Sequence, residues 1–316
     1  MRTPVGLVVL FALSACSLYK EQSPEKPDPQ VHDVLYAENL FIAVGERGLL
    51  LTSADGLTWT RRASPTQSTL HGIAYGEGRF VAVGEGGSIL TSEDGISWKR
   101  VSSPDIPAEP LYGVAYGNGR FLAVGRMLLL SMDRGESWRP LGWGTQERVR
   151  FCGTFLAVGT TTVGPLAYGT IFASADGLHW EIRYRYLLAG LRDIACGPVP
   201  VAVGMAPNGQ AIFVASDPEG YSWQGQPSPL GRALERVGYA EGRFLAVGRQ
   251  GSVLTSGDGL TWEGQSLGEQ WDLSALAYGA GRWVAFAHSG RGETRLFFSL
   301  DGGRSWQSRA LAIGAP

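Results

Sequence analysis

Seven short stretches of the chain place a serine, an aspartate, a glycine and a tryptophan at nearly constant spacing. In the stretch SEDGISW these are Ser92, Asp94, Gly95 and Trp98. A carboxylate beside a hydroxyl group could serve as a metal ligand or as a general acid. One carboxylate in each stretch is too few for a calcium site, however, and the copies are spread along the chain. We therefore interpret the aspartate as a turn residue that accepts backbone N–H bonds, and the tryptophan as a buried anchor.

The aspartates of this motif are Asp55, Asp94, Asp133, Asp176, Asp258 and Asp301, and its tryptophans are Trp59, Trp98, Trp138, Trp180, Trp223, Trp262 and Trp306. The fifth copy departs from the pattern, because Pro218 stands where aspartate is expected and Asp217 comes one position early. The chain has none of the spacings typical of zinc sites, phosphate-binding loops or serine nucleophiles. We expect no metal and no cofactor, and we expect these residues to be structural.

The elements that carry the motif repeat with it. Successive motif tryptophans lie 39 to 44 residues apart, and most copies also contain the sequence Ala-Val-Gly. A period near forty residues with short strand-like segments is typical of propeller blades. Within one copy, LHGIAYG, RFVAVG, SILTS and SWKRV read as four strands, and the pairs Glu77-Gly78 and Asn118-Gly119 supply the positive φ that a two-residue hairpin turn needs. We predict an all-β chain, a seven-bladed β-propeller of four-stranded antiparallel blades with the motif in each turn between the third and fourth strands.

The predicted blades cover residues 31–62, 70–101, 111–140, 148–183, 191–224, 234–264 and 273–309 of a propeller domain at 31–316. Each blade is contiguous in sequence, so closure by a strand from the other terminus is not required, although the tail ALAIGAP could add one. The formal net charge of −2 gives no field that would attract nucleic acid. We expect a monomer that does not bind nucleic acid.

The first thirty residues differ from the rest. Arg2 is followed by an apolar stretch from Val5 to Ala15, which is too short to span a bilayer and is typical of a secretory signal. Its end, Leu13-Ser14-Ala15-Cys16, resembles the lipobox of bacterial lipoproteins. The resemblance implies a signal peptide at 1–15, lipid attachment to Cys16, and sorting to the outer membrane because Ser17 follows. Residues 16–30 are then a proline-rich, disordered tether. The alternative is a plain secretory signal.

The repeated motif itself resembles the Asp-box, or BNR repeat, of sialidases, other glycosidases, sorting receptors and photosystem II assembly-factor-like propellers, the last being the most similar in style. The resemblance covers nearly the whole chain after the signal segment, but fold resemblance does not transfer function. We predict a non-catalytic envelope lipoprotein that binds a protein or a cell-surface polymer. The alternatives are a glycoside hydrolase or lyase with its site at the channel mouth, and an assembly factor for a membrane complex.

Length variation between copies falls in one set of loops, which must lie at one end of the blades. These loops and their flanks carry aromatic, arginine and histidine residues that the repeat does not explain: Trp143, Tyr168, Arg183, Tyr184, Arg185, Tyr186, Trp271 and His288. Such residues on variable loops above a rigid scaffold are typical of a binding face. The alternative is that the rings pack down over the ends of the blades.

The second residue of each first strand should lie at the channel mouth on the same face. By this register the mouth carries His32, His71, Tyr112, Arg148, Arg192, Glu235 and Ser274. Such a ring could bind a small polar ligand, or it could hold water and cross-blade ion pairs. A hydrolase would require two carboxylates and an arginine cluster there, and the carboxylates to test are Glu46, Glu85, Asp193, Glu235 and Asp272.

Cys152 and Cys196 align with a tyrosine of the other copies, which places them at one level of adjacent inner strands. A disulfide needs Cα atoms within about 7 Å, and inner strands of neighbouring blades usually lie slightly farther apart. We expect buried free thiols, with a disulfide as the alternative.

Overall fold

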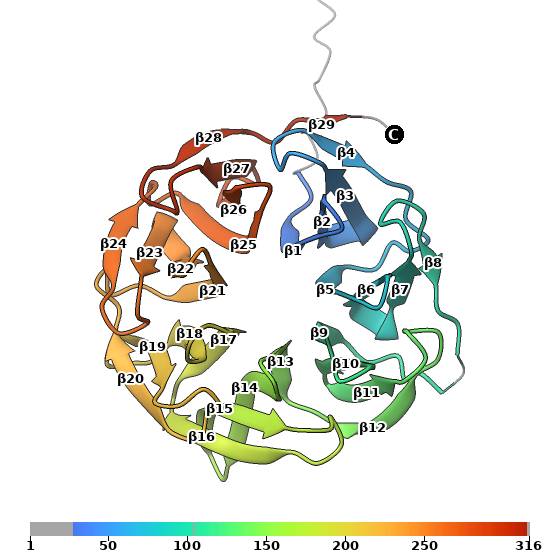
Figure 1. Cartoon of the computed structure of the whole chain (residues 1–316), viewed down its shortest axis with the longest axis horizontal. Helices are drawn as coiled ribbons and strands as arrows, with labels where there is room; N and C mark the ends of the chain where they lie inside the picture. The colour runs from blue at the N-terminus through green and yellow to red at the C-terminus, as the bar shows by residue number, and fades with distance from the viewer. Residues whose placement is uncertain (1–27, 104, 315–316) are drawn as a thin grey trace, which may run out of the picture.

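Short strands joined by tight turns fold into seven antiparallel sheets, arranged as a ring around a central channel (Figure 1). The computed structural model describes residues 28–103 and 105–314. The predicted all-β, seven-bladed propeller with four-stranded antiparallel blades is confirmed. In each blade the strands A to D run outward from the channel, so strand A lines the channel and strand D lies on the rim.

The strands of the seven blades are, in order, β1 (Val31–Ala37), β2 (Leu40–Gly45), β3 (Leu49–Ser53) and β4 (Trp59–Arg61); β5 (Leu70–Gly76), β6 (Arg79–Gly84), β7 (Ile89–Ser92) and β8 (Lys99–Arg100); β9 (Leu111–Gly117), β10 (Arg120–Gly125), β11 (Met127–Ser131) and β12 (Arg139–Trp143); β13 (Gln146–Phe151), β14 (Phe155–Val163), β15 (Leu166–Ser174) and β16 (Glu181–Leu187); β17 (Gly190–Ala195), β18 (Val201–Met205), β19 (Gln210–Ala215) and β20 (Trp223–Pro227); β21 (Leu234–Ala240), β22 (Arg243–Gly248), β23 (Ser252–Ser256) and β24 (Glu263–Ser266); and β25 (Trp271–Gly279), β26 (Arg282–Ser289), β27 (Thr294–Ser299) and β28 (Gln307–Ala310). Single 3-10 turns follow β2, β6 and β22: η1 (Glu46–Gly48), η2 (Glu85–Gly87) and η3 (Arg249–Gly251).

The C-terminal tail adds a strand. β29 (Ile313–Gly314) pairs in parallel with β4, with Ile313 opposite Trp59, so the first blade has five strands. Figure 1 shows this strand lying outside β4, where the last blade meets the first. Blades are contiguous in sequence as predicted, and the tail, which the sequence left open, links the two ends of the ring at its outer edge.

The hydrophobic core lies between neighbouring blades rather than in the channel. Each blade contributes one fully buried phenylalanine: Phe41, Phe80, Phe121, Phe155, Phe213, Phe244 and Phe286. Strand B is buried along nearly its whole length, as in β6, because blades cover both of its faces. The two-residue turns between strands A and B have the positive φ that was predicted, with Glu77 at 46° and Gly78 at 72°.

The turns between strands C and D, here called the C–D turns, are held by local hydrogen bonds. In the second blade, Oδ1 of Asp94 accepts the backbone N–H groups of Ile96 at 2.8 Å and Ser97 at 2.7 Å. The Trp98 indole donates to the carbonyl of Gly95 at 3.0 Å. These backbone bonds, that from Ser97 foremost, lower the pKa of Asp94 to about 2. The carboxylate therefore serves the turn, as the sequence predicted.

The irregular fifth turn keeps the same arrangement. Asp217 accepts the N–H groups of Tyr221 at 2.9 Å and Ser222 at 3.1 Å, so it replaces the aspartate that Pro218 displaces. The Trp223 indole still donates to Gly220 at 2.9 Å. The turn tolerates an aspartate that is shifted by one position, because a carboxylate can accept hydrogen bonds from any of several successive backbone N–H groups.

Strand A has a β-bulge near its start in all seven blades. The register with strand B shifts between Val31 and Asp33 in the first blade, and equivalent shifts recur in the others. The bulged residues are His32, His71, Tyr112, Glu147, Arg192, Glu235 and Ser274. A bulge re-aims side chains at the end of a strand, and here it sets the composition of one channel mouth.

No helix in the described part of the chain is long and apolar enough to cross a membrane.

Candidate binding site at the channel mouth

Six of the seven bulged residues, all but Ser274, surround a cavity of about 360 Å³ at the end of the channel where strand A begins. We call it the mouth cup, and its lining is His32, His71, Tyr112, Glu147, Arg148, Arg192, Glu235 and Arg236. Six of the seven residues predicted at the mouth are bulged residues, and five of these line the cup, Ser274 being the exception. The seventh, Arg148, lies one position deeper, since Glu147 is the bulged residue of its blade.

The error at Arg148 has a local cause. In six blades the residue directly before the bulge is valine or leucine. In the fourth blade this residue is Gln146, which pairs with Gly159. Gln146 is buried, and its side-chain oxygen accepts the N–H of Thr145 at 3.0 Å. A polar residue at an anchoring position removed the signal that would have fixed the register.

Arg148 forms the floor of the mouth cup. Its Nη1 donates to the carbonyls of His71 at 2.8 Å and Tyr112 at 3.0 Å, and its Nη2 donates to the carbonyl of His32 at 3.2 Å. Nη1 also lies 3.3 Å from Oδ2 of Asp33, and both side chains are about 95% buried. One guanidinium thus joins the first three blades to the fourth across the channel.

Glycines make this arrangement possible. A Cβ on Gly72 would lie 3.4 Å from Nη1 of Arg148 and 3.1 Å from the backbone of Gly113. A Cβ on Gly113 would lie 3.1 Å from the Cα of Arg148. The second and third blades therefore leave, at the level of Asp33, the space that the arginine side chain crosses.

A second arginine completes the floor from the opposite side. Nη1 of Arg236 donates to the carbonyl of Glu235 at 2.6 Å, and its Nη2 donates to the carbonyl of His32 at 2.8 Å. Burial, followed by the positive charge of Arg148, lowers the pKa of Arg236 to about 10. The side chain therefore stays charged at neutral pH, and its charge is held close to that of Arg148.

Two aspartates repeat one contact at different places in the ring. Oδ2 of Asp33 accepts the N–H of Ile73 in the next blade at 3.1 Å, and Oδ2 of Asp193 accepts the N–H of Val237 in its next blade at 3.2 Å. Arg150 lies 3.7 Å from the other oxygen of Asp193. Buried carboxylates are thus paired with cations or with backbone donors, as buried charges require.

The rim of the cup is a chain of partly exposed ion pairs. Nη1 of Arg192 contacts Glu147 at 2.8 Å, and its Nε lies 3.8 Å from Glu235. Glu235 in turn contacts Nε of Arg249 at 3.1 Å. Charges of both signs therefore alternate around the opening, which suits a ligand that carries both donors and acceptors.

Histidines and a tyrosine form the other wall. The rings of His32 and His71 lie 5.2 Å apart, those of His71 and Tyr112 lie 5.6 Å apart, and Nε2 of His71 is 2.8 Å from Glu85. Burial, then the charge of His71, then Arg236 and Arg148, lowers the pKa of His32 to about 3. His32 is therefore neutral at physiological pH and offers an uncharged ring to the cup.

The carboxylates that the sequence proposed for a hydrolase do not gather in this cup. Among Glu46, Glu85, Asp193, Glu235 and Asp272, only Glu235 lines it. Its carboxylate neighbour across Arg192 is Glu147, which the register error hid. Within residues 28–103 and 105–314, no group of three or more histidine, cysteine, aspartate or glutamate side chains is placed to hold a metal ion.

The residues of the predicted binding face lie in different environments. Trp143 is 76% exposed and Arg185 is exposed, whereas Tyr168 is half-buried. Tyr184 and Tyr186 pack against Phe213 of the next blade.

The remaining three residues of that face are engaged within the fold. Arg183 pairs with Glu181 at 2.6 Å and lies 3.6 Å above the ring of Tyr221 in a C–D turn, away from the loops. Trp271 is buried against Phe297, and Nδ1 of His288 lies 3.0 Å from Thr294. Five of the eight residues of the predicted face therefore pack against the blades, as the alternative proposed.

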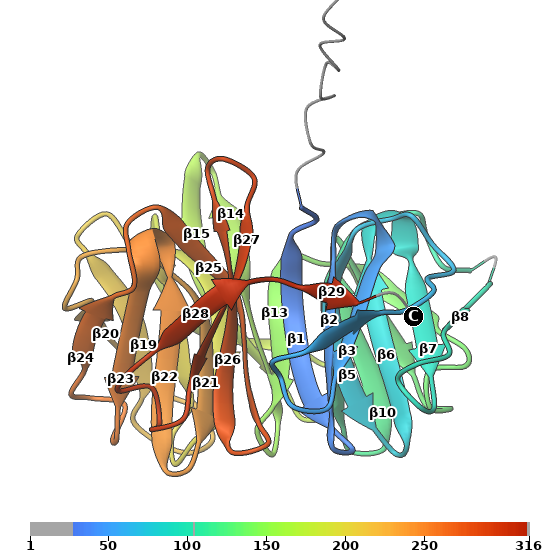
Figure 2. The ribbon, with the colours of Figure 1, turned by 90° about the horizontal axis from the view of Figure 1, so that it is seen from above.

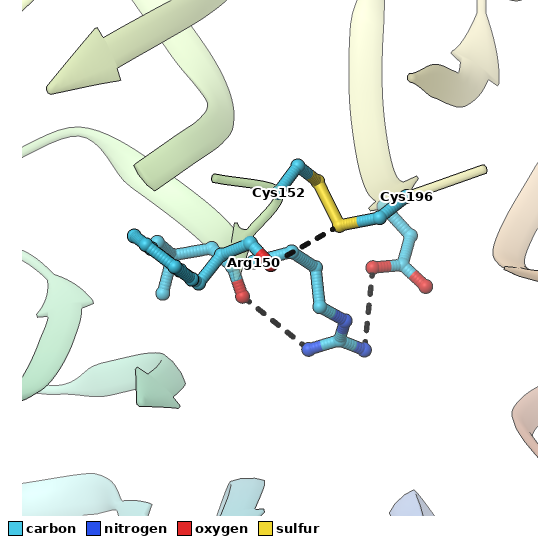
Figure 3. Close-up of a disulfide and its surroundings, with 6 residues drawn as sticks. Arg150, Cys152 and Cys196 are labelled. Atoms are coloured by element: carbon cyan, nitrogen blue, oxygen red, sulfur yellow. Dashed lines mark hydrogen bonds and ion pairs between the residues drawn. A yellow bond between two sulfur atoms is a disulfide. The ribbon is translucent and has the colours of Figure 1, made fainter. Parts of the chain in front are cut away.

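The two cysteines form a disulfide, so the expectation of free thiols is wrong. Their Cα atoms lie 5.3 Å apart, and Figure 3 shows the bond beside Arg150. Sγ of Cys196 also lies 3.4 Å from the carbonyl of Phe151. The bond joins the inner strands of the fourth and fifth blades at the end of the channel that carries the A–B and C–D turns, which we call the turn end.

The distance between the two cysteines was misjudged because the alignment placed the first strand of the fourth blade one residue out of register. In the fourth blade the aromatic position is held by Phe151, which pairs with Phe155, and Cys152 is one residue farther on. Elsewhere that next residue is glycine or alanine, and in three blades the aromatic ring of the following blade lies against the glycine, as Tyr116 lies against Gly76. Cys152 holds the glycine place and Cys196 the aromatic place, so the disulfide substitutes for this inter-blade contact.

The predicted lipid attachment site, Cys16, lies outside the described residues.

Comparisons with known proteins give neighbours in structure only. No family model matches the chain, and no curated protein matches it. Among solved structures, YCF48 from Cyanidioschyzon merolae is 18% identical with a TM-score of 0.63, covering 87% of this chain and 96% of that chain. A structure described as YCF48 bound to D1 peptide is 19% identical with a TM-score of 0.60, covering 77% and 81%. The Neurospora crassa Pan2 WD40 domain is 13% identical with a TM-score of 0.65, covering 90% and 93%. At these identities the likeness establishes the fold.

Proposed function

We propose that the protein is a non-catalytic scaffold of the bacterial envelope, anchored by lipid at Cys16, that binds a segment of a partner protein over the mouth cup. The observation that carries the proposal is the cup itself. It is a cavity with alternating charges on its rim, built around the bulged positions, where the blades carry histidine, tyrosine, glutamate, arginine or serine and no single residue is repeated throughout. Variable residues on a rigid scaffold are where propellers and other repeat folds place recognition.

An extended peptide suits this cup better than a purely apolar ligand. Its backbone offers both donors and acceptors, which match the carboxylates of Glu147 and Glu235 and the guanidinium of Arg192. Further support comes from the solved neighbour that is described as bound to a peptide. An assembly-factor role, in which the partner belongs to a membrane complex, is the narrower form of this proposal, and the likeness to YCF48 favours it.

A glycoside hydrolase or lyase is the second candidate, because Glu147 and Glu235 flank one arginine in the cup. Glycoside hydrolysis requires one carboxyl group that carries a proton and one that does not. Here both carboxylates form ion pairs with arginine side chains, so their contacts do not assign the two different roles. The pairing therefore supports binding more than acid–base chemistry.

The test is chemical cross-linking in the native envelope, followed by recovery of the full chain. Arg192→Glu reverses the central charge of the rim, and we expect it to remove most of the cross-linked partner, because it places three carboxylates side by side. Arg304→Glu, at an exposed residue of the seventh C–D turn, is the matched control and should leave recovery unchanged. Equal recovery with both variants would contradict binding at the cup.

A further inference from the structure

The opposite end of the propeller carries the mouth cup and the loops that join strands B to C and strands D to A, and we call it the loop end. The sheet of the fourth blade continues beyond the others at this end. Strands β14 and β15 pair through Thr160 with Gly169 and on to Val163 with Leu166, whereas β2 and β3 of the first blade end at Gly45 with Leu49. Four additional residues in each strand add about 13 Å of height. Figure 2 shows this yellow-green hairpin rising above most of the ring, on the face where β1 begins.

The end of this extension is apolar and exposed. Val163 is 52% exposed, Leu166 41%, Leu187 44% and Leu188 54%. The two leucines at 187 and 188 join the hairpin because Leu187 pairs with Tyr168 and the N–H of Leu188 donates to Ala167 at 2.8 Å. We call these four residues the blade 4 tip.

No charged residue interrupts this surface in sequence. The chain carries none between Arg150 and Asp176, and none between Arg185 and Arg192. At the opposite end of the molecule the exposed apolar residues, such as Met132, Leu260 and Leu300, stand singly in separate C–D turns. Single exposed apolar residues are ordinary, whereas four on one projecting hairpin indicate a surface that is covered in use.

The chain enters the propeller on the same face. The N–H of Asp28 donates to the carbonyl of Gly292, in the loop between β26 and β27, and the N–H of Gln30 lies 3.3 Å from Glu46. The residues between Cys16 and Asp28 can span at most about 40 Å when fully extended. A bilayer that holds Cys16 would therefore lie near the loop end, within reach of that hairpin.

We propose that the blade 4 tip inserts into the interfacial region of a lipid bilayer. Val and Leu side chains on an uncharged projection gain free energy by leaving water there. Trp143, exposed on the same loop end where β12 pairs with Met127, is of the residue type that favours the interface. The inference rests on the envelope anchor proposed above but not on the partner, and it orients the propeller with its mouth cup toward the membrane.

The experiment measures where the tip lies in the full chain, reconstituted into vesicles of phosphatidylethanolamine and phosphatidylglycerol. Leu166→Cys receives an environment-sensitive fluorophore, and Met132→Cys, exposed at the opposite end, receives the same fluorophore as the matched control. We expect quenchers carried on the lipid acyl chains to remove most of the signal at residue 166 and none at residue 132. We expect aqueous iodide to give the reverse.

A second variant separates insertion from an effect of the fluorophore. Leu187→Asp with Leu188→Asp places two charges in the tip outside the core, so its melting temperature should equal that of the parent, while lipid quenching at residue 166 should be lost. Protein that sediments with the vesicles but shows equal aqueous quenching at 166 and 132 would overturn the inference and leave the anchor intact. Protein that does not sediment with the vesicles would contradict the anchor and the inference together.

Discussion

The two ends of this propeller use polar residues in opposite ways. At the turn end, each carboxylate satisfies N–H groups a few residues away, as Asp94 does for Ile96 and Ser97. At the loop end, charged groups reach across the channel to other blades, as Arg148 does for Asp33, His71 and Tyr112. The first kind of contact is repeated in every blade. The second occurs in only a few blades, since the position after the bulge holds arginine only at Arg148 and Arg236 and aspartate only at Asp33 and Asp193.

The difference teaches where function can be placed in a repeat fold. A local hydrogen bond can be copied with its blade, because all its partners are copied too. A contact across the channel cannot be copied, since seven arginines at the level of Arg148 would repel one another in one small space. The loop end is therefore free to carry recognition, and the turn end is fixed by the stability of each blade.

The disulfide is where the turn end departs from its repeat, and its removal should have the largest effect. Cys152→Ala with Cys196→Ala should lower the free energy of unfolding by about 2–4 kcal/mol, because the bond closes a loop of 44 residues in the unfolded chain. Urea titration of the parent and the double variant measures the change. A reductant should destabilise the parent alone; equal sensitivity of both proteins would contradict the assignment.

The loop end should give the molecule its sensitivity to mild acid. The pKa of His32 is lowered to about 3 by burial and then by His71, Arg236 and Arg148, whereas in the unfolded chain it returns to about 6.5. Between these values the unfolded state binds one more proton, so stability falls as pH falls, by about 1.4 kcal/mol per pH unit.

Thermal melts from pH 7 to pH 4.5 measure this slope. His32→Gln keeps a polar side chain and the backbone carbonyl that both arginines bind, so it should make the profile flatter. Slopes that coincide for the parent and this variant would show that the loop end does not carry the acid sensitivity.

The smallest effect is expected at a single C–D turn. Asp94→Ala removes the acceptor of two backbone N–H groups, and we expect a loss of about 1 kcal/mol, at the low end of the usual range because water can reach this exposed turn. Partner recovery should not change. Asp94→Asn, which retains an acceptor oxygen, should lose less. An unchanged melting temperature combined with lost partner binding would reverse the roles assigned to the two ends.

Much of the fold could be predicted because its signals are local. The positive φ of Glu77 and Gly78, the turn role of Asp94 and the seven repeats follow from residues close together in sequence. The mouth ring was predicted in six blades of seven, and it failed where Gln146 replaced an apolar marker. The tail strand β29 and the Cys152–Cys196 bond were left open or misjudged, because both depend on how one blade sits against another.

The sequence by itself determined the blade, its number of copies and the turns that close it, since each is a matter of period and of hydrogen bonds within a few residues. The tertiary structure alone decided what meets in the channel. Arg148 reaches Asp33 across 115 residues, and Arg236 reaches the carbonyl of His32 across 204. Such partners are chosen by the twist and packing of whole blades, where a shift of one residue in register changes which side chain faces the channel.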